Sequence, residues 1–346
     1  MNYLQILQDN YKYIATGVAL VFLSILRGYF NGPRSRARKS MEGKIIIVTG
    51  SSEGIGKATA LQLLEDGAKV IFACRSKDKT EAVINSIRDP KVRERAVFMQ
   101  LELSDFASVN SFIQSFSSQF NSLDILINNA GCVYSNFTTT KDGIEATLQV
   151  NTLSPMILTR GLLDLLNKSN GRVINVSSKG YSRSVLNASY FKVEDISKHD
   201  FYKTNYSAFY VYCISKLGNI FFTQYLDKYI LNHKLNIKTA SLHPGVIHTE
   251  LFRDYKNLAL KLFFFMIYPL FWFFSKTVLM GAQTTLNLCY LDDKEFKSGE
   301  YYSDCNVQKL MPHATDGETR NAFINYSRDL INFYGKDKTK FDFEIA

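Results

Sequence analysis

The sequence of 346 residues is poor in the residue types that build metal sites and disulfide frameworks. It has five cysteines and five histidines, and they form neither a CxxC pair nor a Cys/His spacing typical of zinc ligands. An odd number of scattered cysteines is typical of reduced thiols in a reducing compartment; they are Cys74, Cys132, Cys213, Cys289 and Cys305. We therefore expect free thiols and no bound metal.

Internal repeats of solenoid type and low-complexity segments are also absent. The composition is that of a globular chain, with 46% hydrophobic and 21% charged residues. The formal net charge of +9 is partly local, since several basic residues lie between residues 27 and 39. No base-stacking pattern of aromatic residues is interleaved with them, so we expect no nucleic-acid partner.

An uncharged apolar run covers residues 13–26. It is shorter than the about 20 residues that a membrane-spanning helix needs, but Lys12 and Arg27 at its ends can extend their charges to the membrane interface. We expect residues 1–31 to form a membrane anchor helix and residues 32–42 a basic linker. An interfacial helix, a signal peptide and a buried core helix are the alternatives. Because basic residues follow the run, the positive-inside rule places the domain in the cytosol, and we expect the endoplasmic reticulum membrane.

Six short apolar runs alternate with stretches of helical pattern after the linker. The runs are rich in β-branched residues and show little polar alternation, as expected for strands that are covered on both faces. Alternation of strand and helix predicts a parallel sheet. We therefore expect an α/β fold, a doubly wound (Rossmann) parallel sheet in a single domain over residues 43–346, with strands in residues 44–50, 68–75, 96–103, 123–131, 171–178 and 237–245.

Glycines between the first predicted strand and the next helix form the pattern TGxxxGxG, which begins at Thr49. Glycine is needed where the backbone adopts positive φ and where a phosphate approaches main-chain amides. The start of the helix adds partial positive charge. In this strand–turn–helix context the pattern predicts a dinucleotide cradle, with cofactor contacts from Gly50, Ser52, Gly54, Ile55 and Gly56.

The end of the second predicted strand distinguishes the two nicotinamide dinucleotides. NAD sites place Asp or Glu there to bind the ribose 2′-hydroxyl, but this chain has Cys74 followed by Arg75 and no carboxylate before Asp78. Arg75 is placed to pair with a 2′-phosphate, so NADP(H) is favoured over NAD(H). A solvated surface arginine is the alternative interpretation, and Glu53 inside the turn argues against a bound phosphate.

Further motifs follow the glycine turn: NNAG at residues 128–131, Asn151 in VNTLS, Ser177 and Ser178 in NVSS, and Tyr212 and Lys216 in YCISK. In this order the motifs resemble those of the short-chain dehydrogenase/reductase family, over about residues 43–305. The resemblance implies catalysis by Asn151, Ser178, Tyr212 and Lys216.

Tyr212 and Lys216 lie one helical turn apart on one face of a predicted helix. An ammonium beside a phenol lowers the pKa of the phenol. We therefore expect Lys216 to prepare Tyr212 for proton exchange with a substrate oxygen while a hydride moves to or from nicotinamide. The resemblance further implies that Ser178 binds the substrate oxygen, that Lys216 also holds the nicotinamide ribose and that Asn151 anchors a water. For Ser177 we expect a strand-end hydrogen bond.

The resemblance also implies cofactor contacts from Asn128, Ala130, Pro244, Gly245 and Thr249. Glu102 stands where the family usually has an aspartate that contacts adenine, and we expect it to bind the cofactor. Capping or loop roles are the alternative for Asn128 and Asn151. His243 and His248 flank the Pro-Gly turn, where histidine is more often structural than catalytic.

Residues 73–75, 142–151, 276–291 and 298–305 resemble the retinol dehydrogenase-like branch of this family. That branch implies a membrane-associated, NADP(H)-dependent enzyme that interconverts a lipophilic alcohol and its aldehyde or ketone. Residues 262–274 are rich in aromatic and aliphatic side chains. We expect them to form part of an apolar substrate lid, about residues 250–280, that dips into the membrane; a buried core helix is the alternative.

Two other functions are consistent with the sequence. One is a steroid or long-chain acyl carbonyl reductase, and the other is a non-catalytic nucleotide-binding membrane scaffold. The complete set of four catalytic-type residues argues against the scaffold, because a binding module gains nothing from a shifted tyrosine pKa. We expect a small lipophilic substrate and a membrane as partners, and the sequence leaves a homodimer open. The tail after Cys305 carries no motif that predicts a role.

Overall fold

The six predicted strand runs form six adjacent strands of one eight-stranded sheet, from the edge strand β3 to β6. The computed structural model describes residues 3–191, 206–247 and 273–335. The strands run in the order β3-β2-β1-β4-β5-β6-β7-β8, and every neighbouring pair is parallel except β7 with β8. The predicted doubly wound parallel sheet in a single domain is confirmed. The strands are β1 (Ile45–Thr49), β2 (Lys69–Cys74), β3 (Ala96–Gln100), β4 (Ile125–Asn128), β5 (Arg172–Val176), β6 (Lys238–His243), β7 (Tyr301–Ser303) and β8 (Asn306–Val307).

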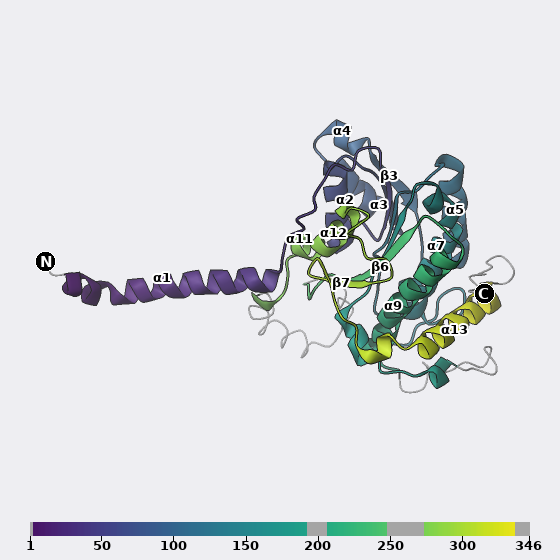
Figure 1. Cartoon of the computed structure of the whole chain (residues 1–346). Helices are drawn as coiled ribbons and strands as arrows, with labels where there is room; N and C mark the ends of the chain where they lie inside the picture. Colours follow the sequence, from purple (N-terminus) through teal and green to yellow (C-terminus); the bar gives the residue numbers. More distant parts are fainter. Residues whose placement is uncertain (1–2, 192–205, 248–272, 336–346) are drawn as a thin grey trace.

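Helices cover both faces of the sheet (Figure 1). α5, α7, α9 and α13 pack on one face, and α2, α3 and α12 pack on the other. The bounds are α1 (Tyr3–Asn31), α2 (Gly54–Glu65), α3 (Lys77–Asn85), α4 (Pro90–Arg93), α5 (Phe106–Gln119), α6 (Ala146–Leu148), α7 (Ser154–Gly161), α8 (Leu163–Lys168), α9 (Ala208–Asn232), α11 (Val278–Gly281), α12 (Gln283–Tyr290) and α13 (Gly317–Gly335). A π-helical turn, η1 (Gln149–Leu153), precedes α7, and short 3₁₀ turns are η2 (Lys179–Arg183), η3 (Ala188–Phe191) and η6 (Pro312–Ala314).

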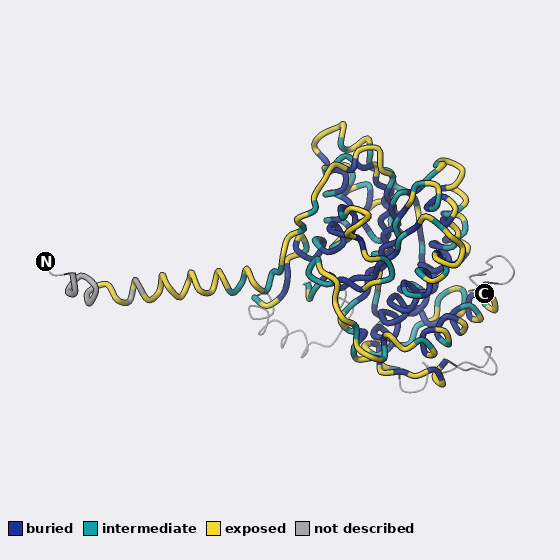
Figure 2. Tube along the Cα trace, viewed as in Figure 1, coloured by how far each residue is buried: buried dark blue, intermediate teal, exposed yellow. Residues whose placement is uncertain are grey.

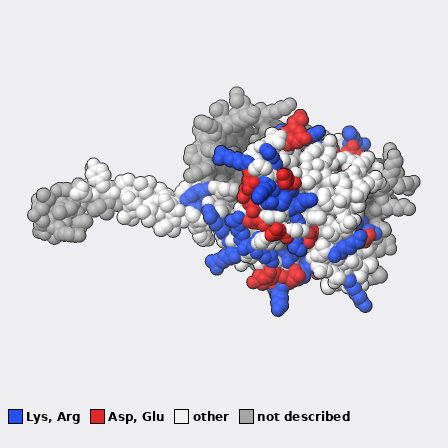
Figure 3. All heavy atoms as spheres, turned by 90° about the horizontal axis from the view of Figure 1, so that it is seen from above, with Lys and Arg blue, Asp and Glu red and all other residues white. Residues whose placement is uncertain are grey.

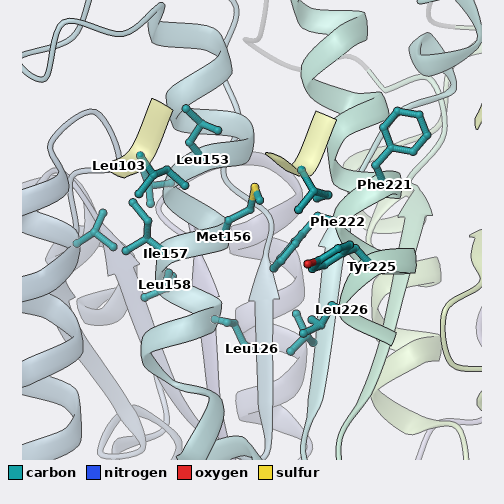
Figure 4. Packing of buried hydrophobic residues seen from close by; sticks show 14 of the residues in the cluster. Leu103, Leu126, Leu153, Met156, Ile157, Leu158, Phe221, Phe222, Tyr225 and Leu226 are labelled. Atoms are coloured by element: carbon teal, nitrogen blue, oxygen red, sulfur yellow. The ribbon is translucent and has the colours of Figure 1, made fainter. Parts of the chain in front are cut away.

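The central strands bury side chains toward both helical layers (Figure 2). In β1, Ile47 belongs to the core under α5, α7 and α9, whereas Ile46 and Val48 belong to the core under α2 and α12. Figure 4 shows the first of these cores, in which Met156 of α7 and Phe222 of α9 gather with Leu126 of β4, among others. Neither face of such a strand meets water, which explains why the strand runs lack polar alternation.

The sequence does not predict the two strands at the far edge of the sheet. β7 extends the sheet because Tyr301 pairs with Ser241 of β6. The chain then turns at Asp304 and Cys305, which have positive φ values of 52° and 61°, and returns as β8. These strands are three and two residues long, too short for a periodic pattern to reveal them.

Part of the tail that carries no sequence motif is a helix packed on the body. α13 places Phe323 against Phe221 of α9, with ring centres 5.8 Å apart, and against Phe191, at 5.2 Å. Gly218 of α9 makes this approach possible, since an added Cβ would lie 2.5 Å from the Phe323 ring. α13 therefore closes the core over the outer face of α9, and only residues 336–346 of the tail lie outside the described residues.

α1 projects from the body (Figure 1) and exposes its side chains along most of its described length (Figure 2). Among the residues that the structure describes, none of the helices combines the length and the apolarity that a membrane crossing requires. The membrane-spanning anchor expected for residues 1–31 is therefore not shown. The physical reason is that the apolar stretch between Lys12 and Arg27 is shorter than the about 20 residues of a span.

The linker after α1 packs against the body. Ser35 donates its backbone N–H to Gln283 Oε1 and its hydroxyl to Asn287 Oδ1, each at 3.0 Å. Arg38 binds the Asp66 carboxylate at 2.6 Å, and Met41 is buried. Basic side chains gather on this side of the molecule, beside the base of α1 and interspersed with acidic ones (Figure 3). We call residues 33–41 the strap.

We predict that Phe323→Ala lowers the free energy of unfolding by about 3–5 kcal/mol, because it removes a fully buried ring from the contact between α13 and α9. Urea denaturation followed by circular dichroism measures this. Phe333→Ala is the matched control on the same helix, since Phe333 is 48% exposed and Phe323 is 1% exposed. If Phe323→Ala lowered the free energy of unfolding no more than Phe333→Ala does, the contact between Phe323 and α9 would not stabilise the fold.

Candidate active site

The predicted site residues come together at the carboxyl ends of the parallel strands. Gly50 follows β1, Arg75 follows β2, Ser178 follows β5 and Pro244 follows β6. In an open parallel sheet this edge holds the ligand where the strand order reverses. Here the order reverses between β1 and β4, which are neighbours in the sheet.

The glycine turn after β1 is held in place by the loop after β4. Gly50 and Gly54 have φ values of 66° and 56°, a conformation that disfavours any residue with a side chain. Thr49 Oγ1 accepts hydrogen bonds from the backbone N–H groups of Asn129 and Ala130, each at 3.0 Å. The Asn129 side chain donates to the Thr49 carbonyl at 2.8 Å. Thr49 and Asn129 thus position the turn, and the sequence signal for Asn129 was the second asparagine of NNAG.

The start of α2 offers main-chain donors to an anion. Glu53 is the N-cap residue and makes no side-chain hydrogen bond to the first turn of the helix. An added Cβ at Gly54 would meet nothing within 4 Å. Open space beside uncapped amides at a helix N-terminus suits a phosphate, so these residues fit the pyrophosphate of a dinucleotide. Ser52 and Ile55, also predicted to bind it, are half-buried in the same turn.

Arg75 and Glu102 form an ion pair at the edge of this site. The Arg75 Nε lies 3.5 Å from the Glu102 carboxylate, and the Arg75 side chain is 72% exposed. The second Glu102 oxygen accepts hydrogen bonds from the Ser104 N–H and hydroxyl, at 3.1 and 2.8 Å. Glu102 therefore contacts Arg75, the side chain predicted to bind a 2′-phosphate. The sequence did not predict this ion pair. Across the turn, Lys79 lies 4.0 Å from Glu53.

Ser178, Tyr212 and Lys216 meet where β5 ends against α9. The Ser178 side chain hydrogen-bonds the Tyr212 hydroxyl and also accepts the Gly180 N–H at 3.1 Å. Lys216 Nζ lies 5.8 Å from the centre of the Tyr212 ring and donates to the Val176 carbonyl at 2.9 Å. The structure thus brings the three predicted side chains to one place.

The pKa of Tyr212 differs from the sequence expectation. Burial raises the pKa of Tyr212, and the hydrogen bond from Ser178 only partly offsets this effect. Burial also lowers the pKa of Lys216 to about 8. The expected lowering of the Tyr212 pKa by Lys216 is therefore wrong for the protein alone. The reason is that loss of water disfavours the charged form of each group, the Tyr212 phenolate and the Lys216 ammonium.

Asn151 lies in the π-helical turn η1 with its amide fully engaged by the protein. Its Oδ1 accepts the Cys132 N–H at 2.8 Å, and its Nδ2 donates to the Cys132 carbonyl and to Ser215 Oγ, each at 3.0 Å. Gly131 leaves room here, because an added Cβ would lie 3.2 Å from Lys216 Nζ and 3.4 Å from Asn151 Oδ1. Asn151 therefore fixes the loop after β4 beside the lysine.

Asn128 and Ser177 make structural contacts. Asn128 Nδ2 donates to Asn175 Oδ1 at 2.9 Å and to Thr159 Oγ1 at 3.1 Å, which ties β4 to β5 and α7. Ser177 Oγ donates to the Lys216 carbonyl at 2.6 Å, a strand-end hydrogen bond as expected. A residue that the sequence did not indicate, Asn219, donates to the same Val176 carbonyl as Lys216 does, at 3.2 Å.

The turn after β6 is packed against one buried lysine. Pro244 is buried, and Gly245 has a φ of 99°, where an added Cβ would lie 2.5 Å from Lys276 Cδ. His243 Nδ1 accepts the Lys179 N–H at 3.2 Å, a structural role. Burial and the nearby Lys276 cation lower the pKa of His243 to about 4. Thr249, His248 and the lid up to residue 272 lie outside the described residues.

The sheet order, the glycine turn and the group of Ser178, Tyr212 and Lys216 define a dinucleotide-dependent oxidoreductase. Consistent with this, a family model described as short chain dehydrogenase matches residues 44–191. Proteins of this family act on CH–OH groups with a nicotinamide cofactor.

Curated relatives specify the branch. The chain is 35% identical over 308 residues to retinol dehydrogenase 12 of Homo sapiens, covering 88% of this chain and 92% of that protein. It is 34% identical over 323 residues to retinol dehydrogenase 14 of Mus musculus, covering 87% and 92%. The protein belongs to the short-chain dehydrogenase/reductase family, in its retinol dehydrogenase-like branch.

Solved structures agree with the fold. The chain is similar to an uncharacterized protein from Mycobacterium paratuberculosis, with a TM-score of 0.66 and 24% identity, over 91% of this chain and 100% of that one. Salutaridine reductase from Papaver somniferum gives a TM-score of 0.56 at 22% identity, over 75% and 99%. At such identities the likeness shows the fold alone.

The buried His243 predicts a pH-dependent stability. Its pKa is about 4 in the fold and 6.5 in an unfolded chain, so between these values the unfolded state binds more protons. The free energy of unfolding should therefore fall as the pH drops through this window, with a contribution of about 3 kcal/mol that is complete above pH 6.5. Urea denaturation from pH 4 to pH 7 measures it.

His243→Gln should flatten this pH dependence, and the same substitution at the exposed His233 should leave it unchanged. The slope of stability against pH is the readout, because His243→Gln also changes stability at neutral pH. An identical slope in the wild type and His243→Gln would assign the pH dependence to other groups.

Proposed function

We propose that the protein is a membrane-attached, NADP(H)-dependent oxidoreductase that interconverts a lipophilic alcohol and its aldehyde or ketone, with retinol and retinaldehyde as the model pair. The observation that carries this proposal is the meeting of Ser178, Tyr212 and Lys216 beside the glycine turn. A bound nicotinamide dinucleotide would supply or accept the hydride. The chain's own side chains bind and move the proton.

Tyr212 acts as the proton donor in the reductive direction. Its raised pKa keeps the phenol protonated near neutral pH, and a protonated phenol can donate to a carbonyl oxygen that gains a hydride. The Ser178 hydroxyl, already bonded to Tyr212, binds the same oxygen. Lys216 uses one of its three N–H donors on Val176, which leaves donors for the ribose of the dinucleotide.

Arg75 supports the choice of NADP(H). Its Nε lies 3.5 Å from the Glu102 carboxylate, and its side chain is 72% exposed. An exposed guanidinium at the end of β2 suits a phosphate monoester, which it binds with paired hydrogen bonds.

Membrane attachment and the substrate class rest on two observations. α1 exposes Val18, Leu20, Val21, Phe22 and Ile25, none of which gains from contact with water. We assign α1 to a membrane, lying in or entering its cytosolic face, and favour the endoplasmic reticulum. The relatives named retinol dehydrogenase support a lipophilic alcohol as the substrate.

We predict that Tyr212→Phe lowers kcat by about 10²–10⁴-fold, because the proton donor is lost while the ring still fills its place. Oxidation of NADPH with retinaldehyde and with a saturated long-chain aldehyde, in mild detergent, measures this. Tyr210→Phe on the same helix is the control and should keep wild-type turnover. Turnover by Tyr212→Phe at the wild-type rate would refute the assignment of the proton donor, and unaltered NADPH binding shows that the fold is intact.

Arg75→Ala should raise KM for NADPH by about 10–100-fold and leave KM for NADH nearly unchanged, since only NADPH carries the 2′-phosphate. Steady-state kinetics with both cofactors tests this, with Arg88→Ala as a control for the loss of one exposed positive charge. A similar rise of KM for both cofactors would contradict the role of Arg75 in phosphate binding.

A further inference from the structure

The base of α1 is fixed to the body by specific contacts. The Phe30 ring packs edge-on against Phe274, with ring centres 4.6 Å apart. Asn31 Oδ1 accepts the Thr277 N–H at 3.0 Å. Gly32 lies so close to Lys276 that an added Cβ would be 2.8 Å from its Cε. The strap then continues along α12, so the helix and the body form one connected unit with the base of α1 at their junction.

Exposed apolar side chains surround this junction. Val246, Phe274 and Leu279 are all exposed. They are neighbours in the fold, because Lys276 donates its N–H to the Val246 carbonyl at 2.7 Å and α11, which carries Leu279, begins two residues after Lys276. Single exposed apolar residues need no explanation, but a group of them beside an apolar helix indicates an interaction surface.

Two arginines border the same group. Ser35 binds Gln283 Oε1, and Gln283 Nε2 donates to the Leu279 carbonyl at 3.1 Å, so one side chain separates the strap from Leu279. Arg34 and Arg36 flank Ser35 and are exposed, and within the described part of the chain neither has an ion pair. Their neighbours on the strap, Arg38 and Lys39, are instead paired with acidic residues.

We propose that the body itself binds an anionic lipid bilayer through a docking face made of Val246, Phe274, Leu279, Arg34 and Arg36. This inference rests on the membrane attachment proposed above and adds a second contact to α1. A bilayer satisfies both parts of the face at once, since its acyl region accepts the apolar side chains and its anionic headgroups accept the arginines. A second copy of the chain would bring the same positive charges against them.

The docking face lies beside the catalytic residues. Val246 follows the turn after β6, at the carboxyl ends of the strands, where Ser178 and Tyr212 also lie. A bilayer on the docking face therefore lies next to the catalytic edge of the sheet. A lipophilic alcohol or aldehyde dissolved in that bilayer can enter the site from the lipid instead of through water.

An environment-sensitive fluorophore on the full chain tests the proposal. Leu279→Cys carries the probe on the docking face. Leu231→Cys is the matched control near the end of α9, at the amino ends of the strands. The native Leu231 and Leu279 side chains are 69% and 68% exposed. The wild type, taken through the same labelling, corrects for its native cysteines. Vesicles contain phosphatidylcholine and phosphatidylserine, with and without a quencher attached to the acyl chains.

We expect the Leu279 probe to shift to shorter wavelength and to be quenched in vesicles, while the Leu231 probe does neither. Co-sedimentation is measured in parallel. Sedimentation with vesicles and equal responses of the two probes would overturn the docking face and leave α1 as the membrane contact. Failure to sediment would refute membrane attachment itself. A shift without vesicles that grows with protein concentration would show that a second copy covers the face.

The charge of the face has its own test. Arg34→Glu/Arg36→Glu should reduce the gain in vesicle binding that phosphatidylserine gives by at least about tenfold. Arg88→Glu/Arg93→Glu makes the same change of charge just before and at the end of α4, away from α1 (Figure 1), and should leave the gain intact. An equal reduction in both double variants would mean that net charge, and not the docking face, attracts the lipid.

Discussion

Hydrogen bonds between the end of β5 and α9 fix the placement of the whole site. Lys216 Nζ and Asn219 Nδ2 both donate to the Val176 carbonyl, at 2.9 and 3.2 Å. Ser177 Oγ donates to the Lys216 carbonyl at 2.6 Å. These groups are buried, and a buried polar group left without a partner costs about 1–3 kcal/mol. α9 cannot slide along β5 without breaking these bonds, so Tyr212 stays at the strand end.

The burial that secures this geometry also determines the charges in the site. It raises the pKa of Tyr212 and lowers that of Lys216 to about 8, so the free protein favours the neutral form of the phenol. A neutral phenol beside Ser178 is a proton donor, which suits reduction of a carbonyl. The glycine turn is held in a comparable way, because Asn129 and Thr49 bind backbone groups and leave the start of α2 open to a phosphate.

The loop after β6 and Lys276 connect the site to the base of α1. The loop after β6 that carries Gly245 packs on Lys276, and Lys276 also contacts Gly32 at the base of α1. The segment that follows the carboxyl end of β6 therefore also contacts the base of α1, the helix that we propose lies at a membrane. In our proposal, attachment to a lipid surface and access of a lipophilic substrate involve the same few residues, and this would account for the exposed apolar side chains Val246, Phe274 and Leu279.

The sequence by itself determined the elements whose signals are local. The six apolar runs, the glycine pattern and the Tyr212–Lys216 spacing each lie within one segment, and their order predicted the sheet and the candidate site. Tertiary structure decided what depends on residues far apart in the chain. Ser241 creates β7 by pairing with Tyr301, and the Arg75–Glu102 pair crosses from β2 to β3. The upward shift of the Tyr212 pKa also depends on tertiary structure, because burial is a property of the assembled fold that no short stretch of sequence contains.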